Sequence, residues 1–373
     1  MTAADTAPRL SPLARLRAIL GGSAGNLVEW YDWFAYASFS LYFSKVFFPE
    51  EGDQTAQLLK TAAVFAVGFL ARPVGAWLMG MYADHAGRRA AMTLSVASMS
   101  VGSLIIAITP GYKDIGTMAS AILLGARVLQ GLSVGGEYGA SATYMSEMAG
   151  RERRGLWSSF QYVTLIAGQL VALAVLIVLQ KTLSPEELQA WGWRVPFYIG
   201  AALAVIVFWI RIGLDETLSF KSITEKSKID VTHAAIASVL LAVASAAFFL
   251  DLSFGALKGA QIILPVIFLL AAAVTIVAPT FQLHPRETLI IMGLTAYGSL
   301  AFYAYTTYMQ KFLVNTASFT KDQAATINAV TVAIFMIVQP AFGWASDRVG
   351  RKNMLLISGA GGALVAFPVF STI

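Results

Sequence analysis

The sequence predicts an all-helical protein that crosses a membrane about eleven times, and three observations support this fold class. Of the 373 residues, 57% are apolar and 13% are charged, whereas about 25% of the residues in a soluble domain are charged. The mean hydropathy is +0.68. Apolar runs of roughly the 20 residues that a membrane-spanning helix needs recur along the whole chain.

The apolar runs predict both the spans and the organisation of the chain. We expect an N-terminal six-helix bundle over 1–218, an inter-bundle segment with an apolar hairpin over 219–287, and a partial C-terminal bundle of about three helices over 288–373. The spans are expected near 20–45, 57–81, 91–110, 116–146, 156–180, 193–213, 233–253, 261–281, 288–313, 323–345 and 353–371.

The basic residues predict how the chain is oriented in the membrane. If the N-terminus is cytoplasmic, the inside segments hold sixteen Lys and Arg residues, Arg211 among them, and the outside segments hold eight. This excess follows the positive-inside rule. The net charge of +5 therefore indicates orientation and contact with lipids, not nucleic acid. We expect a multi-pass protein of a bacterial-type inner membrane, acting as a monomer.

Several classes of function are disfavoured by what the sequence lacks. The chain has no cysteine and three histidines, all predicted in or beside loops, so we expect no metal and no cofactor. It has no G-x-x-x-x-G-K-[ST] loop for ATP, no nucleophile elbow and no H-E-x-x-H helix. We therefore expect that the protein is not an enzyme.

Two loops carry the same pattern, G-x-x-x-D-x-x-G-R followed by a basic residue. Each joins the end of one predicted span to the start of the next, and both fall on the predicted cytoplasmic side. Such an internal repeat is typical of secondary transporters. We interpret it as a gating motif, formed by Gly80, Asp84, Gly87, Arg88 and Arg89 in the first copy and by Gly343, Asp347, Gly350 and Arg351 in the second.

Charged residues inside the predicted spans are the candidates for proton coupling. A charged side chain at mid-membrane costs roughly 2.5 to 3.5 kcal/mol, so each must face a partner or a wet cavity. Glu29 and Asp32 share one side of the first span. Arg127 lies about 15 Å along its helix from Glu137 and cannot pair with it. Burial favours a neutral carboxyl group and an arginine favours a charged one, so a carboxylate with a removable arginine partner can act as a proton switch. The alternative is a static ion pair.

Arg72 is the candidate substrate ligand, because it lies in mid-span before Pro73. Its guanidinium can hold a carboxylate through two hydrogen bonds. A dicarboxylate needs a second set of donors, and the alternative for such residues is ordinary packing or, for the lysine, snorkelling to the interface. The candidates are Gln161, Tyr162, Tyr308, Gln310 and Lys311.

Glycines on the fourth predicted span indicate close helix packing. Gly131, Gly135 and Gly139 form two overlapping G-x-x-x-G units. Because glycine has no side chain, such units let a neighbouring backbone approach closely. We expect all three to face another helix.

The repeated loop motif resembles the signature of the major facilitator superfamily. The segments 25–32, 69–73, 127–139 and 191–197 look like the metabolite:proton symporter family, and 158–164 and 306–316 are most similar to its alpha-ketoglutarate permeases. The resemblance covers nearly all of 15–220 and 284–373. It implies a central site between two bundles that opens alternately to either side, and proton symport of a small carboxylate such as 2-oxoglutarate. Related sugar symporters pair an acid on span 1 with an arginine on span 4, which suggests Asp32 with Arg127.

Two departures from the family pattern leave alternatives open. Family members have twelve spans in two halves, whereas this chain carries an extra apolar hairpin near 232–282 and its second half stops after the helix corresponding to the ninth span. In the family, the first loop motif contacts the eleventh span, so Asp84 is expected to lack that partner. The alternatives are another substrate of the family (shikimate, citrate, proline or betaine) or a transport-inactive, truncated membrane protein.

Overall fold

The computed structural model describes residues 12–48, 54–149, 151–214, 281–309 and 321–372, with residue 271 and positions 312–313 and 316–319. Nearly all of these residues are helical, which confirms the all-α class. The α-helices are α1 (Pro12–Phe47), α2 (Gln54–Ala86), α3 (Arg88–Ile108), α4 (Tyr112–Ile115), α5 (Thr117–Met148), α6 (Arg154–Ser158), α7 (Phe160–Thr182), α8 (Pro185–Ala190), α9 (Val195–Ile212), α13 (Pro285–Tyr303), α15 (Lys321–Val349) and α16 (Arg351–Thr372). Short helical turns are η2 (Arg151–Arg153), η3 (Gly192–Arg194) and η4 (Ala304–Tyr308).

Eight helical segments of the described chain are long and apolar enough to cross a membrane, and they match eight predicted spans. They are Lys60–Ala86, Arg88–Ile108, Thr117–Met148, Arg154–Thr182, Gly192–Ile212, Pro285–Thr306, Thr326–Val349 and Arg351–Val369. The first predicted span forms α1, which is not among the eight and carries Asn26, Glu29 and Asp32 at its centre. The hairpin expected near 232–282 lies outside the described residues apart from a few positions.

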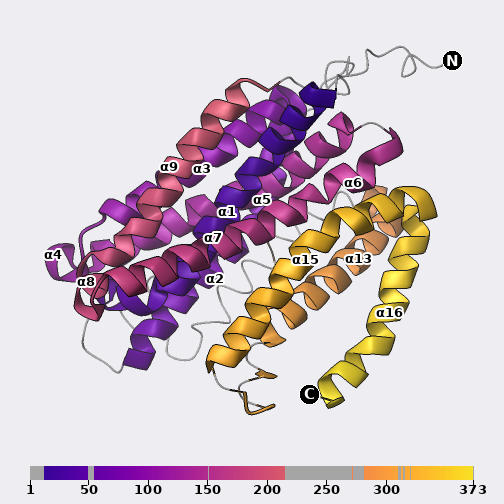
Figure 1. Ribbon diagram of the computed structural model, residues 1–373. Coiled ribbons are helices and arrows are strands. Elements are labelled where there is room, and N and C mark those ends of the chain that lie inside the picture. The colour runs from indigo at the N-terminus through magenta and orange to yellow at the C-terminus, as the bar shows by residue number, and fades with distance from the viewer. Residues whose placement is uncertain are drawn as a thin grey trace.

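Helices α1 to α9 pack into one bundle (Figure 1). Helix α2 packs along α5, α3 packs against α5 and α9, and α1 packs against α7. At one end of the bundle, aromatic side chains of α1 pack with residues from the start of α9 and the turn before it, and Phe43, Phe47, Trp193 and Phe197 are completely buried. These contacts fix α1 in the centre, where its polar residues face neighbouring helices.

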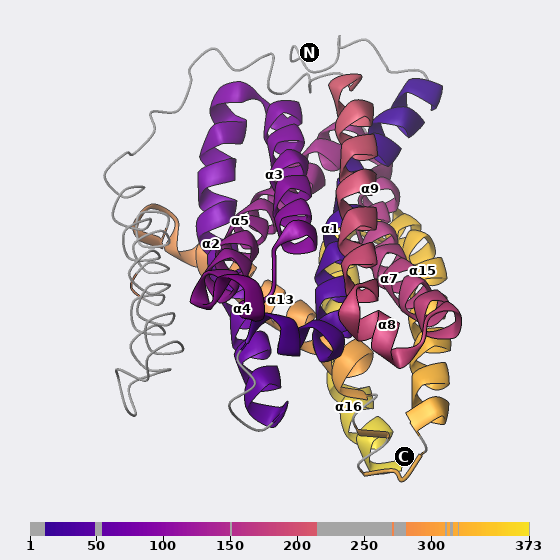
Figure 2. The same cartoon turned by 90° about the vertical axis from the view of Figure 1, so that its left-hand side faces the viewer.

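Helices α13, α15 and α16 stand along one side of this bundle (Figures 1 and 2). Helix α15 packs against α6 and α7, and α16 contacts α15. Many large apolar side chains of these three helices are exposed, including Leu300, Ile337 and Phe367. Such a surface suits lipid or further helices, and α15 provides the main contact with the first bundle.

Helices α2 and α5 approach each other at glycines. A Cβ atom added to Gly131 would overlap the backbone oxygen of Gly68, and one added to Gly135 would overlap the backbone oxygen of Arg72. The predicted close packing is therefore confirmed at Gly131 and Gly135. It is wrong for Gly139, because a Cβ atom there would meet nothing within 4 Å. The contact at Gly135 fixes the backbone that carries Arg72.

We expect Gly135→Ala to destabilise the protein by about 1 to 3 kcal/mol, the usual cost of overpacking, because α2 must move away from α5. The measurement is thermal unfolding of the purified protein in detergent. Gly139→Ala is the matched control on the same helix and should leave the unfolding temperature nearly unchanged. Equal effects of the two substitutions would contradict the packing described here.

Candidate functional site

The polar centre of α1 faces the inside of the bundle. Asn26, Glu29 and Asp32 recur every three residues, so they share one side of the helix. All three are at most 1% exposed. The amide of Asn26 donates to the Gln161 backbone oxygen of α7 at 2.6 Å and accepts a bond from Trp30. Since every one of these groups lies in an apolar bundle, its partners decide what it can do.

Asp32 and Arg127 lie together, as predicted, but an amide stands between them. Nη1 of Arg127 donates to Oε1 of Gln130 at 2.7 Å, and Nε2 of Gln130 donates to Oδ2 of Asp32 at 2.7 Å. The direct distance from Arg127 Nη1 to Asp32 Oδ2 is 3.9 Å. The hydroxyl of Ser103 donates to the other carboxylate oxygen. The sequence analysis missed Gln130, although it lies three residues after Arg127 and so on the same helix face.

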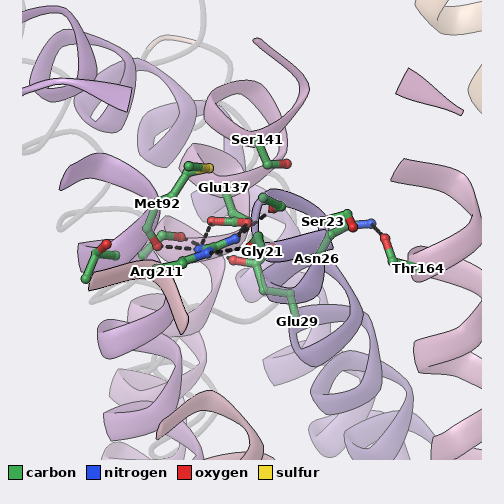
Figure 3. A network of polar contacts seen from close by, with 12 residues as sticks. Gly21, Ser23, Asn26, Glu29, Met92, Glu137, Ser141, Thr164 and Arg211 are labelled. Atoms are coloured by element: carbon green, nitrogen blue, oxygen red, sulfur yellow. Dashed lines mark hydrogen bonds and ion pairs between the residues drawn. The ribbon is translucent and has the colours of Figure 1, made fainter. Parts of the chain in front are cut away.

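Glu137 pairs with Arg211, which the sequence analysis counted among the basic residues of the inside segments. Arg211 lies in the last turn of α9 and is completely buried. Its guanidinium bonds both carboxylate oxygens of Glu137, one of them at 2.8 Å (Figure 3). It also donates to the backbone oxygens of Gly22 and Met92. A basic residue at the end of an apolar run resembles an interfacial anchor, which explains why this pair was not predicted.

Glu29 has weaker partners than the other buried acids. One carboxylate oxygen accepts bonds from the hydroxyls of Ser95 and Ser133 at 3.2 and 3.4 Å. The other oxygen, Oε2, is buried without a hydrogen-bond partner among the described residues. Glu29 lies near enough to Glu137, Arg211 and Arg72 to interact with their charges. It is thus a buried carboxyl group held by hydroxyls and not by a direct ion pair.

Arg72 lies against aromatic rings between the first bundle and α13. Its Cζ atom is 4.0 Å from the ring centroid of Trp33, 4.3 Å from that of Phe69 and 5.3 Å from that of Trp30. The guanidinium lies near enough to Tyr303, the last residue of α13, to interact with its hydroxyl. Its Nε and Nη2 atoms are buried with no hydrogen-bond partner in the described chain. Arg72 therefore faces the meeting point of the two helix groups and retains free donors.

Three of the five other predicted substrate ligands lie within the described residues. Gln161 is buried and accepts a bond from Ser141 at 3.0 Å, while its Nε2 has no partner among the described residues. Tyr162 and Tyr308 are 36% and 55% exposed. Gln310 and Lys311 lie outside the described residues. The roles of these five residues stay predictions, and the structure adds Tyr303, which the sequence analysis missed because only the tertiary structure brings it to Arg72.

The two copies of the loop motif have the same local geometry. Gly87 and Gly350 have φ angles of 104° and 93°, a conformation that favours glycine. Asp84 bonds Arg88 at 2.7 Å, and Asp347 bonds Arg351 at 2.9 Å. Each loop therefore forms the tight turn that the repeat predicts.

Only the second copy joins the two helix groups within the described part of the chain. Asp347 accepts bonds from the backbone N–H groups of Gly155 and Leu156 at 2.7 and 2.9 Å. Beside it, a Cβ atom added to Gly343 of α15 would overlap the Gly155 backbone. Asp84 is 52% exposed and bonds Arg88 on its own turn. The contact at Asp347 closes this end of the molecule.

The first bundle consists of membrane-length helices, and a second helix group is joined to it at a repeated loop. Together with the buried charged residues, these features define a membrane transporter of major facilitator type. The chain belongs to the sugar (and other) transporter family, whose model matches residues 18–373. The fold agrees with a solved structure of the proton:xylose symporter XylE bound to 6-bromo-6-deoxy-D-glucose, at a TM-score of 0.63 and 16% identity over 92% of this chain and 71% of that one.

Three relatives are more similar to this chain in sequence than XylE is. The chain is 45% identical to the alpha-ketoglutarate permease of Escherichia coli K12 over 96% of this chain and 72% of that protein. It is 39% identical to a citrate-proton symporter of Salmonella typhi over 58% of this chain and 29% identical to a proline/betaine transporter of Salmonella typhimurium over 95% of it. It spans 50% and 64% of the lengths of these two relatives.

We expect Glu137→Gln and Arg211→Met each to destabilise the bundle by about 3 to 5 kcal/mol, because each leaves a buried polar or charged partner unsatisfied. The double replacement Glu137→Leu with Arg211→Leu should cost less than the sum of the two single changes. Unfolding of the purified protein measures the cost of the single replacements and of the double replacement. Asp84→Asn, which breaks an exposed pair, is the control and should cost less than about 1 kcal/mol. Additive single and double effects would contradict a coupled pair.

We expect Asp347→Asn to loosen the contact between α15 and the first bundle, because the charge that accepts two backbone N–H groups is lost. The chain has no cysteine, so Ser159→Cys introduces a single thiol at a side chain that lies beneath Gly343 and is 9% exposed. A polar maleimide should label it several times faster in the Asp347→Asn background. Asp84→Asn is the control background; equal labelling in both would argue against a contact that holds this end closed.

Proposed function

We propose that this protein is a proton-coupled symporter that imports a small carboxylate, 2-oxoglutarate, by alternating access. The 45% identity to an alpha-ketoglutarate permease supports the substrate. The observation that carries the proposal is Arg72, a half-buried arginine whose Nε and Nη2 donors are buried and free in the described chain, at the junction of the first bundle and α13. A buried donor without a partner costs about 1 to 3 kcal/mol, more when it is charged, and a bound carboxylate removes that cost.

The position of Arg72 suits a carrier. It lies on α2, while Tyr303 reaches it from α13 in the other helix group. A substrate bound between them would contact both groups, so its binding would depend on how they sit relative to each other. In carriers of this kind, movement of the two groups around a central site exposes that site first on one side and then on the other. We assign the loops with Asp84 and Asp347 to the cytoplasmic side.

The bonds from Asp32 through Gln130 to Arg127 are the proposed proton switch. While Asp32 is charged, its carboxylate holds the Gln130 amide, and Gln130 in turn holds Arg127. A proton on Asp32 removes the negative charge that attracts the guanidinium. Arg127 is then less firmly held on α5, and α1 and α5 are less tightly joined. Glu29, which lacks a direct ion pair, is the second carboxyl group that we assign to proton coupling.

Among the other substrates known for relatives, betaine fits this site poorly. A quaternary ammonium group is usually bound by aromatic rings. In this structure the rings of Trp30, Trp33 and Phe69 already surround the guanidinium of Arg72. Betaine also carries a carboxylate, but its cationic group would be repelled there. The arrangement therefore favours substrates with a net negative charge, including citrate, over betaine.

Uptake of labelled 2-oxoglutarate into cells that express this chain tests the proposal. We expect the cells to take up 2-oxoglutarate, and an uncoupler should abolish this uptake. In Asp32→Asn, uptake driven by the proton gradient should be lost, while exchange of labelled for unlabelled substrate across the membrane should persist, because exchange needs no net proton movement. A chain that inserts into the membrane but transports nothing would favour the inactive alternative. Normal gradient-driven uptake by Asp32→Asn would reject the assigned switch.

A further inference from the structure

Two arginines from different helices lie against the same indole ring. The Cζ atom of Arg72, on α2, is 4.0 Å from the ring centroid of Trp33, and the Cζ atom of Arg127, on α5, is 4.3 Å from it. Adding the two distances gives the largest possible separation of the two Cζ atoms, 8.3 Å. Trp33 is 2% exposed and Arg127 is completely buried, whereas Arg72 is half-buried.

The same two nitrogen atoms are unbonded in both arginines. Nε and Nη2 of Arg72, and Nε and Nη2 of Arg127, are buried with no hydrogen-bond partner among the described residues. These two atoms form the edge of a guanidinium that binds a carboxylate through two parallel hydrogen bonds. The bonds of Arg127 to Gln130 and Asp32 both use Nη1. The pairing with Asp32 therefore leaves the carboxylate-binding edge of Arg127 available.

Two guanidinium groups this close repel each other, and both have one buried edge without hydrogen bonds in the described chain. Aromatic rings attract cations, but they supply no acceptor for these N–H groups. Buried donors without acceptors are rare in folded proteins, and such groups at functional sites commonly await a ligand. A dianion with two separated carboxylates would neutralise both charges and satisfy both edges. A monocarboxylate would neutralise one charge and satisfy one edge.

We propose that Arg72 and Arg127 together bind the two carboxylates of a linear dicarboxylate that passes beside Trp33. This inference rests on the proposed transport function and adds to it a second substrate ligand, Arg127, and a reason for selecting dianions. The carboxyl carbons of a five-carbon dicarboxylate are roughly 5 Å apart, as C–C bonds of about 1.5 Å require. A dianion of that length can lie alongside the two guanidinium groups, with one carboxylate at each free edge, because their carbons are at most 8.3 Å apart.

Gly68 of α2 borders the Nη2 atom of Arg127. A Cβ atom added to Gly68 would lie 3.4 Å from Nη2 of Arg127 and 3.1 Å from the Trp33 ring. The same Cβ atom would lie 3.3 Å from the backbone oxygen of Arg127. Gly68→Ala therefore places a methyl group beside the free edge without removing either guanidinium group. Gly125, two residues before Arg127 on α5, is the matched control, because a Cβ atom there meets nothing within 4 Å.

The test is competition with labelled 2-oxoglutarate in exchange assays on proteoliposomes that contain the full chain. Glutarate is the dicarboxylate competitor and butyrate is the monocarboxylate competitor. We expect glutarate to compete at least about tenfold better than butyrate, because a second charge-assisted pair of hydrogen bonds contributes that much or more. Arg72→Lys, Arg127→Lys and Gly68→Ala should each reduce this ratio severalfold, whereas Gly125→Ala should leave it unchanged.

Thermal stabilisation of the purified protein by the same two acids gives a second measurement that needs no transport. If Arg127→Lys keeps the full preference for glutarate in both measurements, the inference is overturned while the transport function stands. If the chain transports nothing but glutarate stabilises it more than butyrate, and Arg127→Lys removes that difference, the two-arginine site stands and the transport function fails. Equal effects of glutarate and butyrate on the unaltered protein overturn the inference.

Discussion

The structure depends on how charged groups are accommodated inside an apolar helix bundle. Each buried charge must have a counter-charge, hydrogen bonds or a ligand, because the surrounding hydrocarbon provides none. Glu137 and Arg211 satisfy each other directly and add backbone carbonyls from two further helices. Such a complete set of bonds leaves nothing for a ligand, and this pair therefore joins α5 and α9 as a fixed part of the structure.

The groups around Trp33 are satisfied less completely. Asp32 reaches Arg127 mainly through a neutral amide, Glu29 is held by hydroxyls, and Arg72 has one free edge. The same bundle thus contains one tightly bonded pair and, nearer α13, a set of charges with donors and acceptors to spare. A carrier needs both, since a scaffold of helices must keep its shape while a central site binds and releases its substrate. The glycine contacts between α2 and α5 connect the two regions, because the Arg72 backbone rests on Gly135.

Features with a large energetic cost could be predicted from the sequence. Apolar runs predicted eight spans that the structure contains. The cost of burying charge predicted that Asp32 and Arg127 need partners, and the resemblance to related sugar symporters suggested that they pair with each other. Gln130 was missed because a neutral amide in an apolar run attracts no comparable attention. The pairing of Arg211 was not predicted because the end of an apolar run is where both interfacial anchors and buried partners occur. The contact of Arg72 with Tyr303 joins residues far apart in the chain, and only the packing of α13 brings them together.

The contact at Asp347 explains how a local motif acts on the whole molecule. Asp84 and Asp347 form equivalent turns, yet Asp347 alone of the two meets unpaired backbone N–H groups, those of the first turn of α6, in the described chain. Hydrogen bonds to a charged group contribute about 1.5 to 3 kcal/mol each. A preference of about 1.4 kcal/mol already shifts the equilibrium tenfold. A substrate that binds the two helix groups differently in the two arrangements can overcome such a preference, whereas one that binds both equally cannot. Under the proposed alternating access, the substrate must therefore favour the open arrangement by more than this contact favours the closed one.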